Sequence, residues 1–215
     1  TGEVDAIFFD LGLSSPHLDE GERGFSFQNE GPLDMRFDKR GKLTAYEVVN
    51  GYSEEELMKI FFKYGEEKYS RKIAGRIVER RKEKLFETTT ELAEFIKGVV
   101  KEGKTHPATQ VFQAIRIEVN DELGALKEGL EGAMSRLRAG GRLVVISYHS
   151  LEDRIVKQFM RGLEKPEASE DEKIYKNFGD PLVKILTKKP VIPTEEEISS
   201  NPRSRSAKLR ALKKL

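Results

Sequence analysis

The sequence predicts an α/β protein with a mostly parallel sheet and a helical module inserted into the first crossover. Residues 4–9 (VDAIFF) and 142–147 (RLVVIS) are short, apolar and β-rich, which is typical of strands that are buried on both faces. Several amphipathic helical patterns lie between them. Because strand–helix–strand units favour a parallel sheet, this order of segments indicates the fold class.

The first half of the chain is expected to contain a strand, a long loop and a set of helices. Residues 11–43 are rich in Gly and Pro, and a loop of this length inside a compact domain is usually functional. Ser53 and Glu56 form a capping-box pattern ahead of an apolar stripe, which predicts a helix start. Further helices are expected over residues 66–84, from Thr88 or Thr90 onward, and over residues 109–137.

The second half is expected to complete the sheet. Its predicted elements are a strand at 142–147, a helix capped by Ser150 with Asp153, a strand at 182–187, a short acidic helix from Pro193 and Thr194, and an antiparallel edge strand within 206–215. Residues 1–39 and 106–215 are therefore predicted to form the sheet domain. Residues 40–105 are predicted to form the inserted helical domain.

Composition narrows the function classes. The chain has 215 residues, a formal net charge of +1 and no cysteine, which excludes disulfides, thiolate metal sites and a cysteine nucleophile. No apolar run approaches the roughly 20 residues of a membrane span, and the first residues do not resemble a signal peptide. We therefore expect a cytoplasmic protein without a membrane partner. The oligomeric state stays open, a homodimer included.

Two predicted strands end abruptly in polar residues. Asp10 follows the first strand, and Ser147 and His149 follow the second. Because ligands bind beyond the carboxyl ends of the strands in open α/β sheets, these residues are expected to surround one cleft. The plainer interpretation is that Asp10 only caps a loop. The three histidines are dispersed and form no HExxH motif, so no metal site is predicted, although a carboxylate-bound magnesium ion stays open.

Basic residues cluster in two places. Lys or Arg recurs every fourth residue from Lys68 to Lys84, and the tail from Ser199 onward holds six basic residues and no acidic one. Either cluster suits contacts with RNA phosphates. A solvated helix face is the equally weighted alternative for the helix.

Four long segments resemble one known family. They are DLGLSSPHLDEGERGFSFQNEGPLDMRFD (10–38), THPATQVFQAIRIEVNDEL (105–123), GGRLVVISYHSLEDRIVKQF (140–159) and NPRSRSAKLRA (201–211). In this order they closely resemble the bacterial 16S rRNA cytosine-N4-methyltransferases. The resemblance implies S-adenosylmethionine as cofactor, a cytidine in the decoding region of 16S rRNA as substrate, and a class I (Rossmann-like) methyltransferase sheet with an inserted helical domain for substrate recognition.

The resemblance covers the later two-thirds or so of a family member. The family's Gly-rich cofactor loop has no counterpart in these residues, so the sheet is expected to be a partial one and the chain alone incomplete for catalysis. The alternative from another class is a non-catalytic fragment that binds RNA or the ribosome.

The resemblance also implies site residues. Asp10 and His17 occupy cofactor-contacting positions, although many members have glutamine at the second. Candidates for the target-base pocket are Asp10, Ser14, Asp34, Arg36, Asn120, Ser147 and His149. Methylation at carbon 5 of cytosine typically needs a cysteine, which is absent, whereas the exocyclic N4 needs only a held and polarised amine. Asp34 paired with Arg36 as a loop cap, and Asn120 on an exposed helix face, are the alternatives for those residues.

Overall fold

The computed structural model describes residues 2–14, 16, 20–100, 106–165 and 180–215. Two compact units divide the chain: one comprises Thr1–Gly12 and Leu123–Leu215, the other Leu13–Glu122. The first unit holds the sheet and the second is helical. The predicted insertion at 40–105 lies within the second unit, which also includes the long loop before it and the first part of the predicted 109–137 helix.

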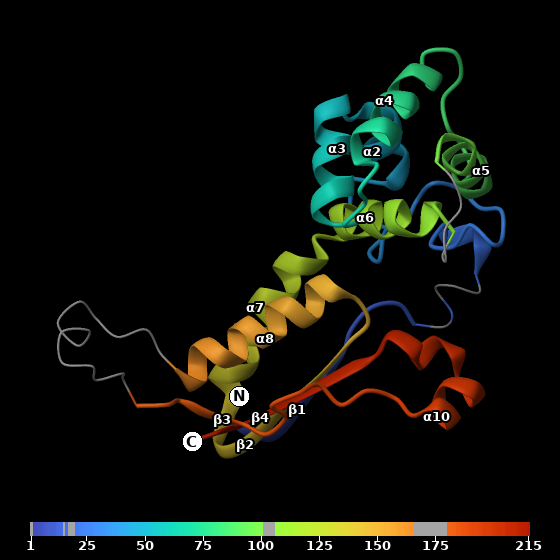
Figure 1. The fold of residues 1–215 in the computed structure, drawn as a ribbon. Helices are drawn as coiled ribbons and strands as arrows, with labels where there is room; N and C mark the ends of the chain where they lie inside the picture. The colour runs from blue at the N-terminus through green and yellow to red at the C-terminus, as the bar shows by residue number, and fades with distance from the viewer. Residues whose placement is uncertain (1, 15, 17–19, 101–105, 166–179) are drawn as a thin grey trace. The chain divides into compact units, whose positions relative to one another are not determined.

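The sheet has four strands in the order β1-β2-β4-β3 (Figure 1). These are β1 (Val4–Asp10), β2 (Leu137–Ser147), β4 (Lys208–Lys214) and β3 (Val183–Ile185). β1 and β2 are parallel, as the sequence predicts, and β4 runs antiparallel to both β2 and β3. The structure is thus a mixed α/β fold. The prediction that the tail strand lies at an edge is wrong, because β3 pairs with its outer side.

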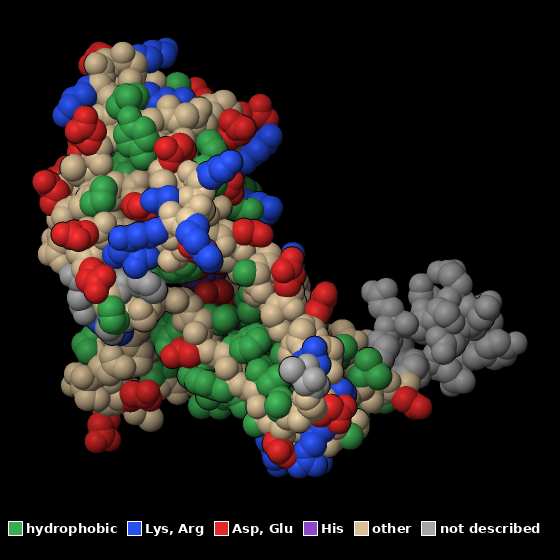
Figure 2. Space-filling view, turned by 180° about the vertical axis from the view of Figure 1, so that it is seen from behind, with side chains coloured by type: hydrophobic (Ala, Val, Ile, Leu, Met, Phe, Trp, Pro, Cys, Tyr) green, Lys and Arg blue, Asp and Glu red, His purple; other side chains and the backbone are tan. Residues whose placement is uncertain are grey.

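Two helices cover one face of this sheet. α7 (Glu122–Arg136) and α8 (Ser150–Glu164) lie on the same side of it in Figure 1. Their apolar side chains form one core with the inward residues of the strands: Leu126, Leu130, Val156 and Met160 pack with Leu137, Leu143, Val145 and Leu212. In Figure 2, hydrophobic side chains also gather on the surface over the sheet-bearing part.

β1 departs from the prediction of a strand buried on both faces. Ile7 and Phe9 pack against the core, but Val4 and Phe8 on the opposite face are 40% and 58% exposed. β1 is hydrogen-bonded to β2 alone and lies at the edge of the described sheet. A continuous apolar run cannot reveal by itself whether a strand is central or at an edge.

The second unit consists of helices around one apolar core. They are α2 (Ala45–Gly51), α3 (Glu54–Lys63), α4 (Ser70–Arg80), α5 (Thr89–Val99) and α6 (Ala108–Asn120). Ser53 caps α3 and Glu56 returns the bond, so the predicted capping box is confirmed. Thr88 caps α5. None of the helices within the described ranges is both long and apolar enough to cross a bilayer.

The single long helix predicted over 109–137 is in fact two. Asp121 has a left-handed backbone conformation (φ 44°), which ends α6 at Asn120, and α7 begins at Glu122. Asp is one of the few residues that tolerate this conformation. α7 then ends at Arg136, and β2 begins at once at Leu137, before the glycines expected to terminate the helix.

Most of the predicted basic stripe has polar partners within its own unit. Lys72 donates to the carbonyl of Val99, Arg76 pairs with Glu79, and Arg80 and Lys84 both pair with Glu91. In Figure 2, basic side chains on the helical part are interspersed with acidic ones. These contacts favour the solvated-face interpretation, since compensated charges offer a weaker field to phosphates.

Candidate active site

The carboxyl ends of β1 and β2 meet at one edge of the sheet. Asp10 is opposite Ile146 in the parallel register, and the N–H of Leu11 donates to the carbonyl of Ile146 at 3.1 Å. The turn Ser147 to Ser150 therefore follows directly beside Asp10. The structure confirms that these two polar strand ends are neighbours, and it makes them the most promising place in the first unit for chemistry.

Tyr148 joins the two strand ends. Its hydroxyl donates a hydrogen bond to Oδ1 of Asp10 at 2.9 Å. Burial and this hydrogen bond to a carboxylate raise the pKa of Tyr148 to about 12, so the phenol stays neutral and keeps donating at physiological pH. Asp10 itself is exposed, and no described residue binds its Oδ2. The site thus presents one oriented carboxylate oxygen to solvent.

Gly12 lets the chain leave this edge. Its φ of +86° lies in the region that L side chains rarely adopt, and a Cβ there would sit 3.5 Å from the ring of Tyr148. Glycine therefore allows the turn after Asp10 to pass close beside the tyrosine at little conformational cost.

His149 begins α8. Its Nδ1 accepts a bond from the N–H of Glu152 at 3.4 Å, and Glu152 Oε2 accepts from the N–H groups of Tyr148 and His149. The prediction that Ser150 and Asp153 cap this helix is therefore wrong by one residue. Burial raises the pKa of Glu152, but His149 and the two backbone N–H groups outweigh it and hold the pKa below its ordinary value. This network fixes the shape of the turn beside Asp10.

Ser147 and Asp153 connect the turn to β4. Ser147 is buried, and its hydroxyl donates to the carbonyl of Lys208 at 3.4 Å. Asp153 accepts two hydrogen bonds from Arg210, at 2.7 and 3.2 Å. Burial raises the pKa of Asp153, but Arg210 and Lys208 lower it overall. A paired, partly buried carboxylate of this kind serves structure more readily than proton transfer.

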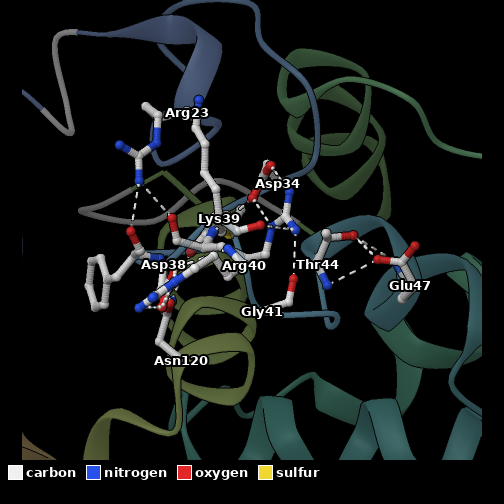
Figure 3. Close-up of polar contacts among 12 residues, drawn as sticks. Arg23, Asp34, Asp38, Lys39, Arg40, Gly41, Thr44, Glu47 and Asn120 are labelled. Carbon is white, nitrogen blue, oxygen red and sulfur yellow. Dashed lines mark hydrogen bonds and ion pairs between the residues drawn. The ribbon is translucent and has the colours of Figure 1, made fainter.

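The other polar candidates belong to the second unit and hold one loop. Asp34, labelled in Figure 3, forms a two-pronged ion pair with Arg36, with bonds of 2.8 and 2.7 Å. Arg36 also donates to the carbonyls of Lys39 and Gly41. The hydrogen bond from Arg36 is the main cause that lowers the pKa of Asp34. These contacts agree with the loop-cap interpretation of the pair.

Asn120 binds the same loop from the end of α6 (Figure 3). Its amide nitrogen donates to the carbonyls of Met35 and Arg116, and its Oδ1 accepts from the N–H of Phe37 at 2.7 Å. Arg23 donates to the carbonyls of Arg36 and Phe37 from the opposite direction. Asn120 therefore lies at the C-terminal end of α6 rather than in the middle of a helix, and its side chain is hydrogen-bonded rather than exposed without partners.

The remaining predicted positions have less structural support. Ser14 is exposed in the second unit. His17 lies outside the described residues. Sequence reasoning missed Tyr148 and Glu152. Tyr148 stands between two chosen residues, and Glu152 lies three residues after His149, which is the capping-box spacing.

Comparison with known proteins decides the family. The family model described as "MraW methylase family" matches residues 1–215. The chain belongs to the MraW methylase family. Ribosomal RNA small subunit methyltransferase H of Streptococcus dysgalactiae subsp. equisimilis is 50% identical over 99% of this chain and 69% of its own length, and the protein of the same name from Carboxydothermus hydrogenoformans is 53% identical over 99% of this chain and 70% of its own length.

Proposed function

We propose that this protein takes part in S-adenosylmethionine-dependent N4-methylation of a cytidine in the decoding region of 16S rRNA. The MraW methylase match over the whole chain and the relatives named as small-subunit rRNA methyltransferases support the reaction class. The single structural observation that carries the proposal is the exposed carboxylate of Asp10, oriented by Tyr148 at the carboxyl end of a parallel strand.

The sheet order supports a class I, Rossmann-like assignment for the first unit. In such sheets the cofactor and the substrate both bind beyond the carboxyl ends of the parallel strands. An antiparallel strand β4 between β2 and β3 is compatible with this class. The range 40–105, within the helical unit, is proposed to contribute to substrate recognition.

The chemistry of Asp10 fits a cofactor or amine contact. A carboxylate is an acceptor only, and its Oδ2, which no described residue binds, suits an O–H or N–H donor. S-adenosylmethionine would supply an electrophilic methyl group, and the resemblance assigns Asp10 and His17 to its contacts. The neutral Tyr148 holds the other oxygen of Asp10, so the carboxylate keeps one direction without being neutralised.

Methyl transfer to N4 needs no covalent intermediate between the protein and the base. The target amine must be held in line with the methyl group, and an acceptor must polarise its N–H. The chain has no cysteine for a covalent attack on the ring, which agrees with N4 as the acceptor atom. The base must be unstacked from its neighbours to reach such a site. Asp10 is the acceptor at the described strand ends that has a free oxygen.

The other candidates are proposed to act mainly through shape. Ser147 and His149 fix the turn beside Asp10, and Asp34, Arg36 and Asn120 fix the 34–41 loop of the second unit. Ser14 keeps its proposed place in the base pocket by resemblance alone. A homodimer remains a proposal of the same kind.

Methyl transfer tests the proposal. Small-subunit RNA is incubated with S-adenosylmethionine that carries a labelled methyl group, using this chain and a chimera that adds the part of a relative outside the match. Label in the RNA with either protein supports the proposal. If both proteins bind the RNA but neither binds S-adenosylmethionine nor transfers label, the alternative is established: the chain is a non-catalytic RNA-binding fragment.

A further inference from the structure

A cavity of about 410 Å³ lies at the first turn of α8, within the first unit. Its walls come from the turn Tyr148 to Ser150, from the segment around α10 (Glu195–Ser200), and from the entry to β4. Its volume falls in the range of about 300–1,000 Å³ that is usual for small-ligand sites. Tyr148 lines this cavity and also binds Asp10, so the cavity adjoins the proposed active site.

One wall of the cavity is basic. Arg205 and Lys208 line it, and none of its ten lining residues is Asp or Glu. Arg205 is exposed and has no hydrogen-bond or ion-pair partner in the described part of the chain. Lys208 lies 3.9 Å from Oδ2 of Asp153, an acid held mainly by Arg210. Two cations without a full counter-charge at a helix N-terminus suit a phosphate group.

His149 also lines this cavity. The side chain of His149 is only 10% exposed, and its Nδ1 accepts the N–H of Glu152, so its Nε2 carries the proton in the neutral ring. Nε2 lies 3.3 Å from Oε1 of Glu152, within ion-pair distance, although the pair does not have hydrogen-bond geometry. His149 therefore contributes to the cavity wall while its ring is held within the turn by Glu152.

Another part of the lining is apolar. Ile192, Pro193 and Ile198 line it, and Ile192 is 65% exposed although it is a large aliphatic side chain. Together with the ring of Tyr148, these side chains offer a surface against which a planar base can pack. A basic part and an apolar, aromatic part within one lining match the two halves of a nucleotide.

We propose that this cavity binds a nucleotide of the substrate RNA next to the target cytidine, with its phosphate against Arg205 and Lys208 and its base against Ile192 and Tyr148. The inference rests on the proposed function, since it names where the RNA adjoins the methylation site. Arg210 and Lys214 in the same basic tail do not share this role. Arg210 pairs with Asp153, and Lys214 donates to the carbonyls of Met134 and Leu137.

RNA binding by charge-deletion variants tests the inference. A fluorescently labelled single-stranded fragment of small-subunit rRNA is titrated with the wild-type chain, with Arg205→Ala/Lys208→Ala, and with the control Lys189→Ala, at several salt concentrations. Lys189 is exposed and does not line the cavity. We expect the double variant to bind about tenfold more weakly and its log–log salt slope to fall by about 0.7, the value for one lost phosphate contact on a single strand. The control should match the wild type.

Photo-crosslinking gives the second readout. A 4-thiouridine placed beside the target cytidine should crosslink to the peptide that contains Ile192, and the yield should fall in the double variant. Unchanged affinity and salt slope in the double variant, with methyl transfer intact, overturn the cavity assignment and leave the proposed function standing. A wild-type chain that does not bind the RNA overturns both.

Discussion

The hydroxyl of Tyr148 lies 2.9 Å from Oδ1 of Asp10 and donates a hydrogen bond to it. This contact joins the ends of two parallel strands that are separated by well over a hundred residues of sequence. It orients an exposed carboxylate without neutralising it, because the tyrosine stays protonated.

Replacement of Tyr148 tests the orienting role. In Tyr148→Phe the ring still packs beside Gly12, but Asp10 loses the donor that fixes one of its oxygens. We predict that methyl transfer falls about tenfold to a hundredfold, as expected for a misplaced reacting group, while the circular dichroism spectrum is unchanged. Turnover equal to that of the wild type would show that the hydrogen bond plays no part in the reaction.

Alkaline titration tests the electrostatics of the same pair. Burial and Asp10 raise the pKa of Tyr148 to about 12, above the ordinary 10.0. Because the folded pKa is the higher one, the stability this group contributes is present below pH 10 and is lost as the pH rises toward 12. Ultraviolet difference titration against Tyr148→Phe isolates the residue. We predict that the pKa of Tyr148 is lower in Asp10→Asn than in the wild type but still above its ordinary value, because the burial remains. An unchanged pKa of Tyr148 in this variant would contradict the contribution of Asp10.

The ion pair of Asp34 with Arg36 is predicted to stabilise the second unit. Asp34→Asn should lower the free energy of unfolding by about 1–3 kcal/mol, because a partly buried guanidinium loses its charged acceptor. The Asp34 pKa is lowered from 3.8, so this contribution is present above pH 3.8 and is lost as the pH falls through the lowered value. Urea unfolding at neutral and acidic pH measures both effects.

Asp38→Asn is the matched control for that experiment. Asp38 binds Arg40 with the same spacing, but both side chains are largely exposed. It should change stability little. Equal losses in the two variants would mean that the partial burial of the Asp34 pair is irrelevant.

Asn120 is predicted to anchor the 34–41 loop. Asn120→Ala removes two donated bonds and one accepted bond, and should cost about 2 kcal/mol of unfolding free energy. Gln110→Ala, an exposed amide on the same helix α6, should be close to neutral. Hydrogen exchange of the Phe37 N–H measures the local effect directly. Unchanged protection of that N–H in Asn120→Ala would refute the anchoring role.

Sequence patterns located most of the helices and strands, but they did not show which strands pair with one another or where a helix is interrupted. The capping box at Ser53 and the apolar strands carry local signals, because capping and periodicity depend on residues close in sequence. The break at Asp121 and the central position of β4 depend on a single backbone conformation and on pairing with distant strands. Neither feature changes the periodicity of apolar residues, with a period of 3.6 in helices and of two in strands, from which helices and strands are predicted.

The candidate site shows the same difference between signals that are local in sequence and contacts that depend on the fold. Asp10, Ser147 and His149 were identifiable because polar residues after apolar strands converge in a parallel sheet. Tyr148 was missed because its role arises from one cross-strand contact. Arg36 and Asn120 are polar residues whose partners are mostly backbone groups of a loop, and only the folded structure reveals such partners.

The central claim is that the carboxylate of Asp10 serves methyl transfer to N4 of cytidine. Mass spectrometry of nucleosides tests it most directly. Small-subunit RNA is incubated with labelled S-adenosylmethionine and either this chain or the chimera, whichever transfers methyl groups, and the products are compared with those of the same protein carrying Asp10→Ala. We predict labelled N4-methylcytidine with the unchanged sequence and none with Asp10→Ala, whose fold and Tyr148 remain intact. Label on carbon 5, or equal N4-methylcytidine from both proteins, would contradict the account.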